Sequence, residues 1–101
     1  MTSSFDELIG EDLSGVTFVR NHLQLQFNPP LVLNVFTPVM IRSKGVEAKS
    51  GEQAFANMLI AQINKFVTNV DFRADDALRL TFDDGSSIVI SLRQEHSGPK
   101  Q

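Results

Sequence analysis

The amino-acid sequence predicts an α+β fold. We expect two similar three-stranded antiparallel units, about six strands in all, packed with one central amphipathic helix and a short N-terminal helix. Three observations support this. Several short segments alternate apolar and polar residues, as strands with one buried face do. Residues 51–64 have helical spacing instead. The strand-rich segments on the two sides of that helix resemble each other.

Length and composition indicate one globular domain. The chain has 101 residues, so we expect a single domain over residues 1–101. Hydrophobic residues make up 42% and charged residues 21%, as in ordinary globular proteins. The formal net charge of −3 argues against nucleic-acid binding.

Cysteine is absent, which excludes disulfides, thiolate catalysis and cysteine metal sites. The first residues show no basic region followed by an apolar run, so we expect no signal peptide. The longest apolar stretch, residues 31–41, is interrupted by polar residues and a proline and is short of the roughly 20 residues of a membrane helix. These features predict a cytoplasmic protein that does not act at a membrane.

The first β unit is expected over about residues 15–42. Alternation predicts strands over residues 16–20 and 23–27, and Asn-Pro-Pro at 28–30 predicts the turn that follows them. A third strand is expected over residues 31–36, resuming after a bend at a proline.

Two helices are expected. Ser4 and Glu7 form a capping box at the start of a short N-terminal helix. Ser50 and Gln53 form a second capping box at the start of the helix over residues 51–64. Its apolar residues follow an i, i+3, i+4 pattern, with Gln62 among the residues on the polar side.

The second β unit is expected over about residues 66–92, followed by a polar tail at 93–101. Residues 78–82 alternate cleanly. The Asp-Asp-Gly-Ser sequence at 83–86 predicts a hairpin with a type I′ turn, because Asp-Gly tolerates positive φ. The returning strand covers residues 87–92.

The two units align as an internal repeat. Residues 23–27 match residues 78–82, and the turn at 28–30 stands where 83–85 stands in the second unit. Each half then has a helical lead-in and three strands, and the central helix would cover one face of the sheet. The alternative is strand patterning shared without a common architecture.

The third strand of the first unit is apolar on both faces. If Leu31, Leu33 and Val35 face the core, either the strand is central and covered on both sides, or its outer side is an interface; the small size of the domain favours the second. We therefore expect a homodimer whose interface contains Val32, Phe36 and Met40.

Candidate catalytic and metal-binding residues are few. Asp75–Asp76 and Asp83–Asp84 are paired carboxylates, but they fit turns and lack the spacing of a calcium loop. His22 and His96 are the only histidines and lie in no catalytic or metal-binding motif. We expect no catalytic residue, no metal and no cofactor.

Residues 43–49 are polar and predict a loop. Small residues and lysines at 43–45 and 49–51 precede the central helix, where an anion can bind, but their spacing fits no phosphate-binding motif. The candidate contacts for a ligand or partner are His22 and three arginines on or beside strands: Arg20, Arg79 and Arg93. Arginines in this setting bind carboxylates of a partner or form cross-strand pairs with nearby Asp residues.

Residues 81–99 resemble the closing segment of a family of small bacterial proteins with no assigned activity. That family has a Phe-Asp-Asp/Asn-Gly turn, a strand ending Ser-Leu-Arg and a Pro-Glu-Asp-Tyr-x-Gly-Pro-Glu-like tail. The tail residues that match are Arg93, Glu95, Gly98 and Pro99, whereas Gln94, His96, Ser97 and Lys100 depart from the pattern. The resemblance implies a bacterial cytoplasmic protein with a longer natural tail, and it transfers no catalytic residue.

Two functions of different classes follow from these observations. The first is a non-enzymatic protein-interaction module, homodimeric, acting through a sheet face or the third strand. The second is a small-ligand-binding protein or minor enzyme, with a pocket between helix and sheet lined by phenylalanines and with Arg79, Arg93 or His22 at its mouth. The lack of a catalytic constellation favours the first.

Overall fold

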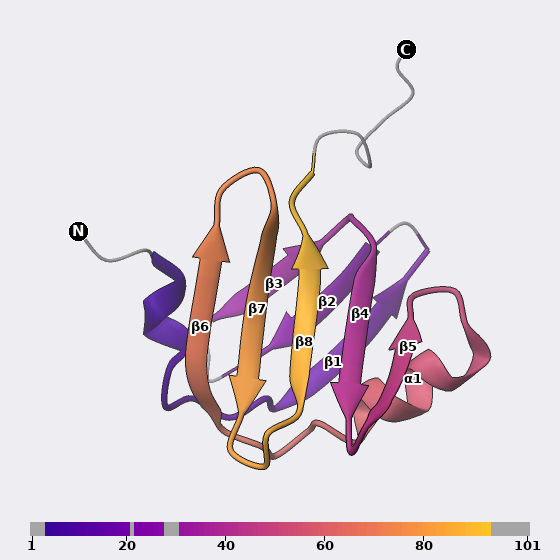
Figure 1. Ribbon diagram of the computed structural model, residues 1–101, viewed down its shortest axis with the longest axis horizontal. Helices are drawn as coiled ribbons and strands as arrows, with labels where there is room; N and C mark the ends of the chain where they lie inside the picture. Colours follow the sequence, from indigo (N-terminus) through magenta and orange to yellow (C-terminus); the bar gives the residue numbers. More distant parts are fainter. Residues whose placement is uncertain (1–3, 21, 28–30, 94–101) are drawn as a thin grey trace.

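The computed structural model describes residues 4–20, 22–27 and 31–93. Within them the fold is α+β with antiparallel sheets: eight strands, one α-helix and one 3-10 helix (Figure 1). The elements are η1 (Ser4–Leu8), β1 (Gly15–Val19), β2 (His22–Gln26), β3 (Val32–Val35), β4 (Val39–Ser43), β5 (Val46–Lys49), α1 (Gln53–Ile60), β6 (Val67–Arg73), β7 (Ala77–Phe82) and β8 (Ser87–Ser91). No helix in these residues is long and apolar enough to span a membrane.

The strands form two sheets that lie one behind the other (Figure 1). The smaller sheet has the order β1-β2-β3, and the larger has the order β5-β4-β8-β7-β6. The helix α1 lies at the β5 edge of the larger sheet, and η1 lies at the opposite edge, beside β6. One face of the larger sheet therefore meets the smaller sheet, and no other element within residues 4–20, 22–27 and 31–93 forms a layer over its other face.

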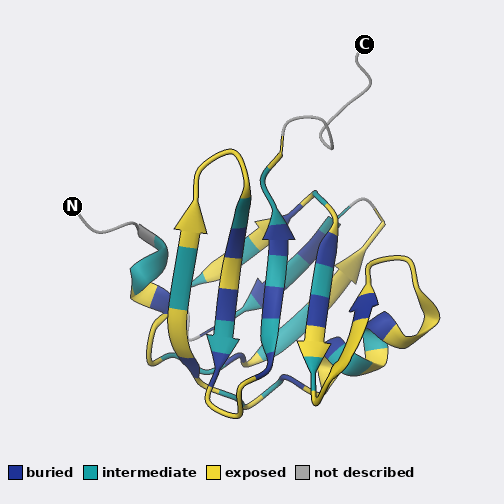
Figure 2. Ribbon diagram, viewed as in Figure 1, coloured by how far each residue is buried: buried dark blue, intermediate teal, exposed yellow. Residues whose placement is uncertain are grey.

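The core lies between the two sheets, and the strands alternate between it and the surface (Figure 2). Leu25 and Phe27 come from the smaller sheet side, and Leu80 and Ile88 come from the larger sheet. Alternation in β7 and β8 points every second residue inward, and those residues are buried. Phe55 and Leu59 of α1 close the core at one edge.

The predicted repeat of two equal units is wrong in strand number and in arrangement. The first predicted unit divides, because the chain leaves the smaller sheet after β3 and enters the larger sheet as β4. The break falls at Thr37 and Pro38, and the Thr37 hydroxyl donates to the carbonyl of Ser91, 2.5 Å away, at the end of β8. The predicted bend within one strand is therefore a change of sheet.

Residues 43–49 contain a strand rather than the predicted loop. Strand β5 pairs with β4 through a two-residue turn at Lys44 and Gly45, whose φ angles are 53° and 79°. Positive φ at both central residues is the geometry of a type I′ hairpin turn. Only Ala48 of β5 is buried, so the segment has little of the apolar pattern that identifies strands.

The central helix is shorter than predicted and lies at an edge. It begins at Gln53 because Gly51 has a φ of 94° and Glu52 is extended. The predicted Ser50 cap is wrong: Glu52 is the N-cap residue, and the Ser50 hydroxyl accepts a bond from the Val39 amide instead. The smaller sheet, not α1, covers the inner face of the larger one.

The predicted β7–β8 hairpin is confirmed, with a different turn. The Phe82 amide donates to the Ser86 carbonyl, and the Gly85 amide donates to the Phe82 carbonyl. Gly85 has a φ of 88°, whereas Asp83 and Asp84 do not have positive φ. This is a three-residue loop with glycine in the left-handed position, not a type I′ turn. The turn predicted at 28–30 and most of the predicted tail lie outside the described residues.

Candidate functional site

The predicted interface residues do not form one surface. Val32 lies in β3 beside Phe5 and Leu31, over a small cavity near η1. Phe36 follows β3 and lies at the other end of that strand. Met40 lies on the larger sheet, on the face directed away from the core. The structure therefore places Val32 and Phe36 at the two ends of β3 and Met40 on the other sheet.

Phe36 belongs to a cluster that we call the aromatic end: Phe18, Val19, Arg20, His22, Phe36 and Phe55. Three of its apolar side chains are well exposed, with Phe18 at 51%, Val19 at 42% and Phe36 at 68% of the maximum. The rings of His22 and Phe36 are stacked, with centroids 4.6 Å apart and planes 21° apart. Neighbouring exposed apolar residues of this kind mark a binding surface more often than scattered ones do.

A cavity of about 310 Å³ opens at the aromatic end. It lies between the last residues of β1, the first of β2 and the start of α1, and Val39 at the start of β4 adds a residue of the larger sheet. Phe55, which is buried, and Val39 line it, and Arg20 and His22 are its ionisable lining residues. Two predicted contact residues, Arg20 and His22, thus meet here.

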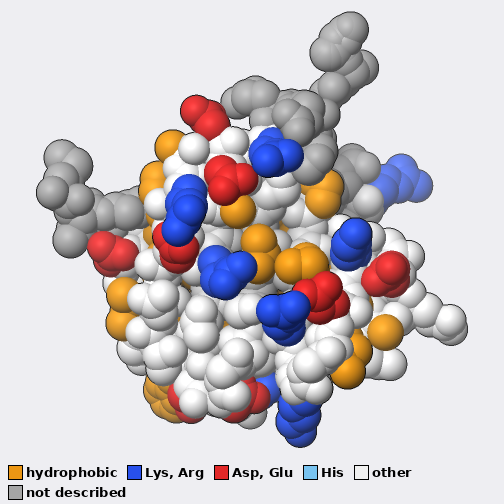
Figure 3. Space-filling model, viewed as in Figure 1, with side chains coloured by type: hydrophobic (Ala, Val, Ile, Leu, Met, Phe, Trp, Pro, Cys, Tyr) orange, Lys and Arg blue, Asp and Glu red, His pale blue; other side chains and the backbone are white. Residues whose placement is uncertain are grey.

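The other two, Arg79 and Arg93, lie on the outer face of the larger sheet, which Figure 3 shows directly. Strand register places one row of outward side chains straight across it: Lys49, Met40, Val89, Arg79 and Asp71. A shallow groove of about 460 Å³ covers Lys49, Met40 and Val89 of the row, whereas Arg79 and Asp71 line an adjoining hollow of about 250 Å³. Apolar side chains lie at the centre of this face (Figure 3).

Charges surround this centre, and cations exceed carboxylates. The cations are Arg42, Lys49, Arg73, Arg79 and Arg93, and the carboxylates among them are Glu47, Asp71 and Asp76. Each carboxylate is paired with an arginine: Glu47 with Arg42 at 2.6 Å, Asp71 with Arg73 at 3.4 Å and Asp76 with Arg93 at 3.5 Å. Cross-strand register sets Asp71 opposite Arg79, but among the described residues neither Arg79 nor Lys49 has an ion-pair partner.

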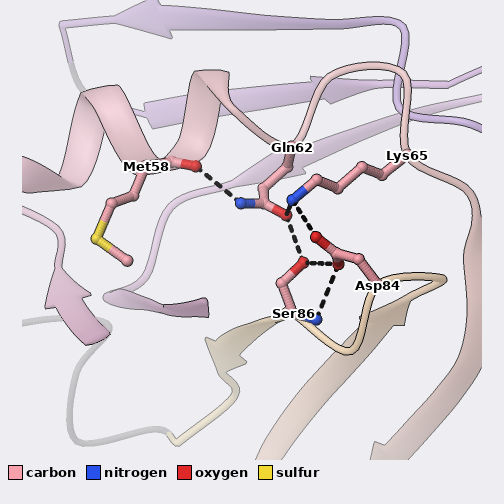
Figure 4. Close-up of polar contacts among 5 residues, drawn as sticks. All are labelled: Met58, Gln62, Lys65, Asp84 and Ser86. Carbon is pink, nitrogen blue, oxygen red and sulfur yellow. Dashed lines mark hydrogen bonds and ion pairs between the residues drawn. The ribbon is translucent and has the colours of Figure 1, made fainter. Parts of the chain in front are cut away.

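A buried polar network joins the turn after α1 to the β7–β8 hairpin (Figure 4). Gln62, only 1% exposed, donates from Nε2 to the Met58 carbonyl at 3.0 Å. Its Oε1 accepts from Lys65 Nζ at 3.1 Å and lies 2.6 Å from the Ser86 hydroxyl. The prediction that Gln62 lies on the polar side of the helix is wrong, because these partners satisfy its amide in the interior.

Asp84 closes the network. Its carboxylate lies 2.5 Å from Lys65 Nζ and accepts from the Ser86 hydroxyl and amide. The hydrogen bond from Lys65, followed by those from Ser86, holds the pKa of Asp84 well below its usual range. The carboxylate is thus ionised at neutral pH and tied to a lysine, which stabilises the fold and leaves it without a proton to donate at that pH.

The remaining candidate residues fit structural roles. Asp83 and Asp84 lie in a hairpin turn, and Asp75 and Asp76 lie in the turn between β6 and β7. In the part of the chain that the structure describes, no group of three His, Cys, Asp or Glu side chains is placed to hold a metal ion. His96 lies outside that part.

Comparisons with known proteins find no family model, no curated protein and no solved structure that matches the chain. The resemblance of residues 81–99 to a bacterial family therefore stays a prediction. The function has to be argued from the two surfaces themselves.

Proposed function

We propose that the chain is a non-enzymatic interaction module that pairs with a second copy of itself through the aromatic end. The observation that carries this proposal is Phe36, a phenylalanine 68% exposed beside an open cavity. Leaving such a ring in water costs roughly 1.5–3 kcal/mol relative to burying it. A partner that covers it gains that free energy.

The aromatic end has both halves of a self-complementary contact. The exposed ring of Phe36 supplies the protruding half, and the adjoining cavity of about 310 Å³ supplies the recess. A cavity of about 150 Å³ holds a benzene ring, so this one has room for a phenyl group. In a two-fold dimer the same patch meets itself, so each Phe36 ring can enter the other copy's cavity.

The test is the mass in solution of the Phe36→Asp variant. We expect the unchanged protein to have twice the chain mass by light scattering and F36D to have the mass of one chain. Since Phe36 is exposed in the single chain, F36D should still fold cooperatively, and its unfolding temperature should fall only by the stabilisation that pairing gave the parent protein. Val46→Asp is the matched control, because Val46 is 56% exposed and lies in β5, away from the aromatic end. A parent protein of single-chain mass, or an unchanged mass in F36D, contradicts the proposal.

A second function is favoured by the lining of the same cavity. Three phenylalanines with Arg20 and His22 could hold a small aromatic carboxylate, with the ring among the phenylalanines and the anion at Arg20. Benzoate and indole-3-acetate are suitable probes in an NMR titration. Saturable shifts confined to the aromatic end of a single-chain protein support this function over pairing; no shifts exclude it for these probes.

A further inference from the structure

The outer face of the larger sheet has a second and separate binding geometry. Lys49 on β5 and Arg79 on β7 lie in one row, and Met40 on β4 and Val89 on β8 lie between them. The row therefore reads cation, two apolar residues, cation. It crosses the strands, and none of the described helices or strands covers it.

Ion pairing distinguishes the two residues at the ends of this row from the other charged residues of the face. Glu47, Asp71 and Asp76 are already paired with Arg42, Arg73 and Arg93, and the Glu52 carboxylate beside Lys49 accepts from the Lys49 amide at 2.7 Å. Of the cations on this face, Lys49 and Arg79 are the two that form no ion pair with any residue of 4–20, 22–27 or 31–93. A chain with a formal charge of −3 thus has a locally positive face, which favours an anionic partner.

We infer that this face binds an extended acidic segment of a partner protein, in which two carboxylates flank one apolar residue. Lys49 and Arg79 each bind one carboxylate. The apolar residue lies in the groove on Met40 and Val89, a groove of about 460 Å³. The segment lies across the sheet and not along an edge strand.

The spacing of the row sets the spacing of the segment. Three strand-to-strand steps separate β5 from β7, which is about 14 Å. In an extended peptide, residues i, i+2 and i+4 share one face, and i to i+4 spans about 13.5 Å. The matching pattern is therefore Glu-x-Leu-x-Glu.

A nucleic acid is the less favoured occupant. Glu47, Asp71 and Asp76 lie on the same face and oppose a continuous row of phosphates. The row itself has no aromatic side chain on which bases could stack. An acidic peptide places its charges only at the two free cations.

The experiment is an NMR titration of the isotope-labelled chain with the peptide Gly-Glu-Thr-Leu-Thr-Glu-Gly, capped at both ends. We expect amide shifts on β4, β7 and β8 and none at the aromatic end. Two control peptides should bind at least tenfold more weakly. One has Lys in place of both Glu residues, and the other has the same five central residues in the order Glu-Glu-Leu-Thr-Thr. A wild-type chain that does not discriminate among the three peptides overturns the inference.

Variants locate the site. Arg79→Glu and Lys49→Glu should each weaken binding of the Glu peptide at least tenfold, and the double variant should prefer the Lys peptide. Lys44→Glu is the control, since it makes the same charge change at the exposed β4–β5 turn, outside the row, and should leave binding unchanged. Both target side chains are exposed, so folding should persist and is checked by amide dispersion. Unchanged binding in R79E, no reversal in the double variant, or tighter binding of oligo-dT than of the Glu peptide overturns the inference.

Discussion

The hydroxyl of Ser86 and the amide oxygen of Gln62 are 2.6 Å apart, and this contact joins the turn after α1 to the β7–β8 hairpin. The single hydroxyl proton is shared between Gln62 and Asp84, whose oxygens are 2.6 and 2.5 Å away. Lys65 supplies further protons to both. The network therefore brings together two parts of the chain about twenty residues apart, and it can be tested one partner at a time.

Gln62→Leu should destabilise the fold by about 1–2 kcal/mol. The change keeps the volume of a fully buried side chain and removes its bond to the Met58 carbonyl, which then stays buried without that donor. Ser86 and Lys65 keep Asp84 as a partner, so the loss stays moderate. Urea unfolding at pH 7 measures it. Gln53→Leu, at an exposed glutamine of α1, should change stability little; equal effects from both would contradict the role of the network.

Asp84→Asn should change how stability depends on pH. The folded-state pKa of Asp84 is lowered, so the ionised carboxylate stabilises the fold at pH values above its unfolded pKa, about 4. This contribution to stability is lost as the pH falls from the unfolded-state pKa toward the folded-state pKa. We expect a deficit of roughly 1 kcal/mol at pH 7, limited by partial exposure to solvent, that shrinks below about pH 4.

Urea unfolding of Asp84→Asn at pH 7 and pH 3 measures this change. Asp83→Asn is the matched control, because Asp83 is the adjacent carboxylate and has no ion pair among the described residues. A deficit in D84N that is the same at both pH values would show that the charge of Asp84 is not its cause.

The turn between β4 and β5 gives a prediction about backbone conformation. Gly45→Ala should cost about 1–2 kcal/mol, because φ is 79° there. An added Cβ meets no atom within 4 Å, so the cost comes from conformation and not from a clash. Lys44→Asn should instead stabilise the hairpin, because Asn-Gly is the favoured type I′ pair. Thermal unfolding of the two variants tests both the expected loss of stability in G45A and the expected gain in K44N. A stabilised G45A would refute the turn assignment.

Elements with clean apolar alternation could be predicted from sequence. Residues 78–82 and the hairpin after them are where the pattern places them, because burial on one face dictates that pattern. Strand β5 was missed because it is held by pairing with β4 and by the Arg42–Glu47 ion pair rather than by burial. The Lys-Gly pair at its turn was the available signal.

The candidate surfaces were harder to predict than the strands. Phe36 and Met40 are close in sequence, yet the change of sheet at Pro38 sends them to different faces. Burial of Gln62 depends on Ser86, which is distant in sequence. Local periodicity has no information about such contacts, because it reports one element at a time.

The place of β8 within the larger sheet has a kinetic consequence. It is the last described strand along the chain, yet it lies in the middle of the sheet, hydrogen-bonded to β4 on one side and β7 on the other. Val39 pairs with Ile90, so about fifty residues of chain must be ordered before that ladder closes, and such non-local pairing slows folding. The β4–β5 hairpin and the β6–β7–β8 meander are each built from local pairings, and the β4–β8 ladder is the non-local pairing that joins them. The surface that Met40 and Val89 share therefore depends on that ladder.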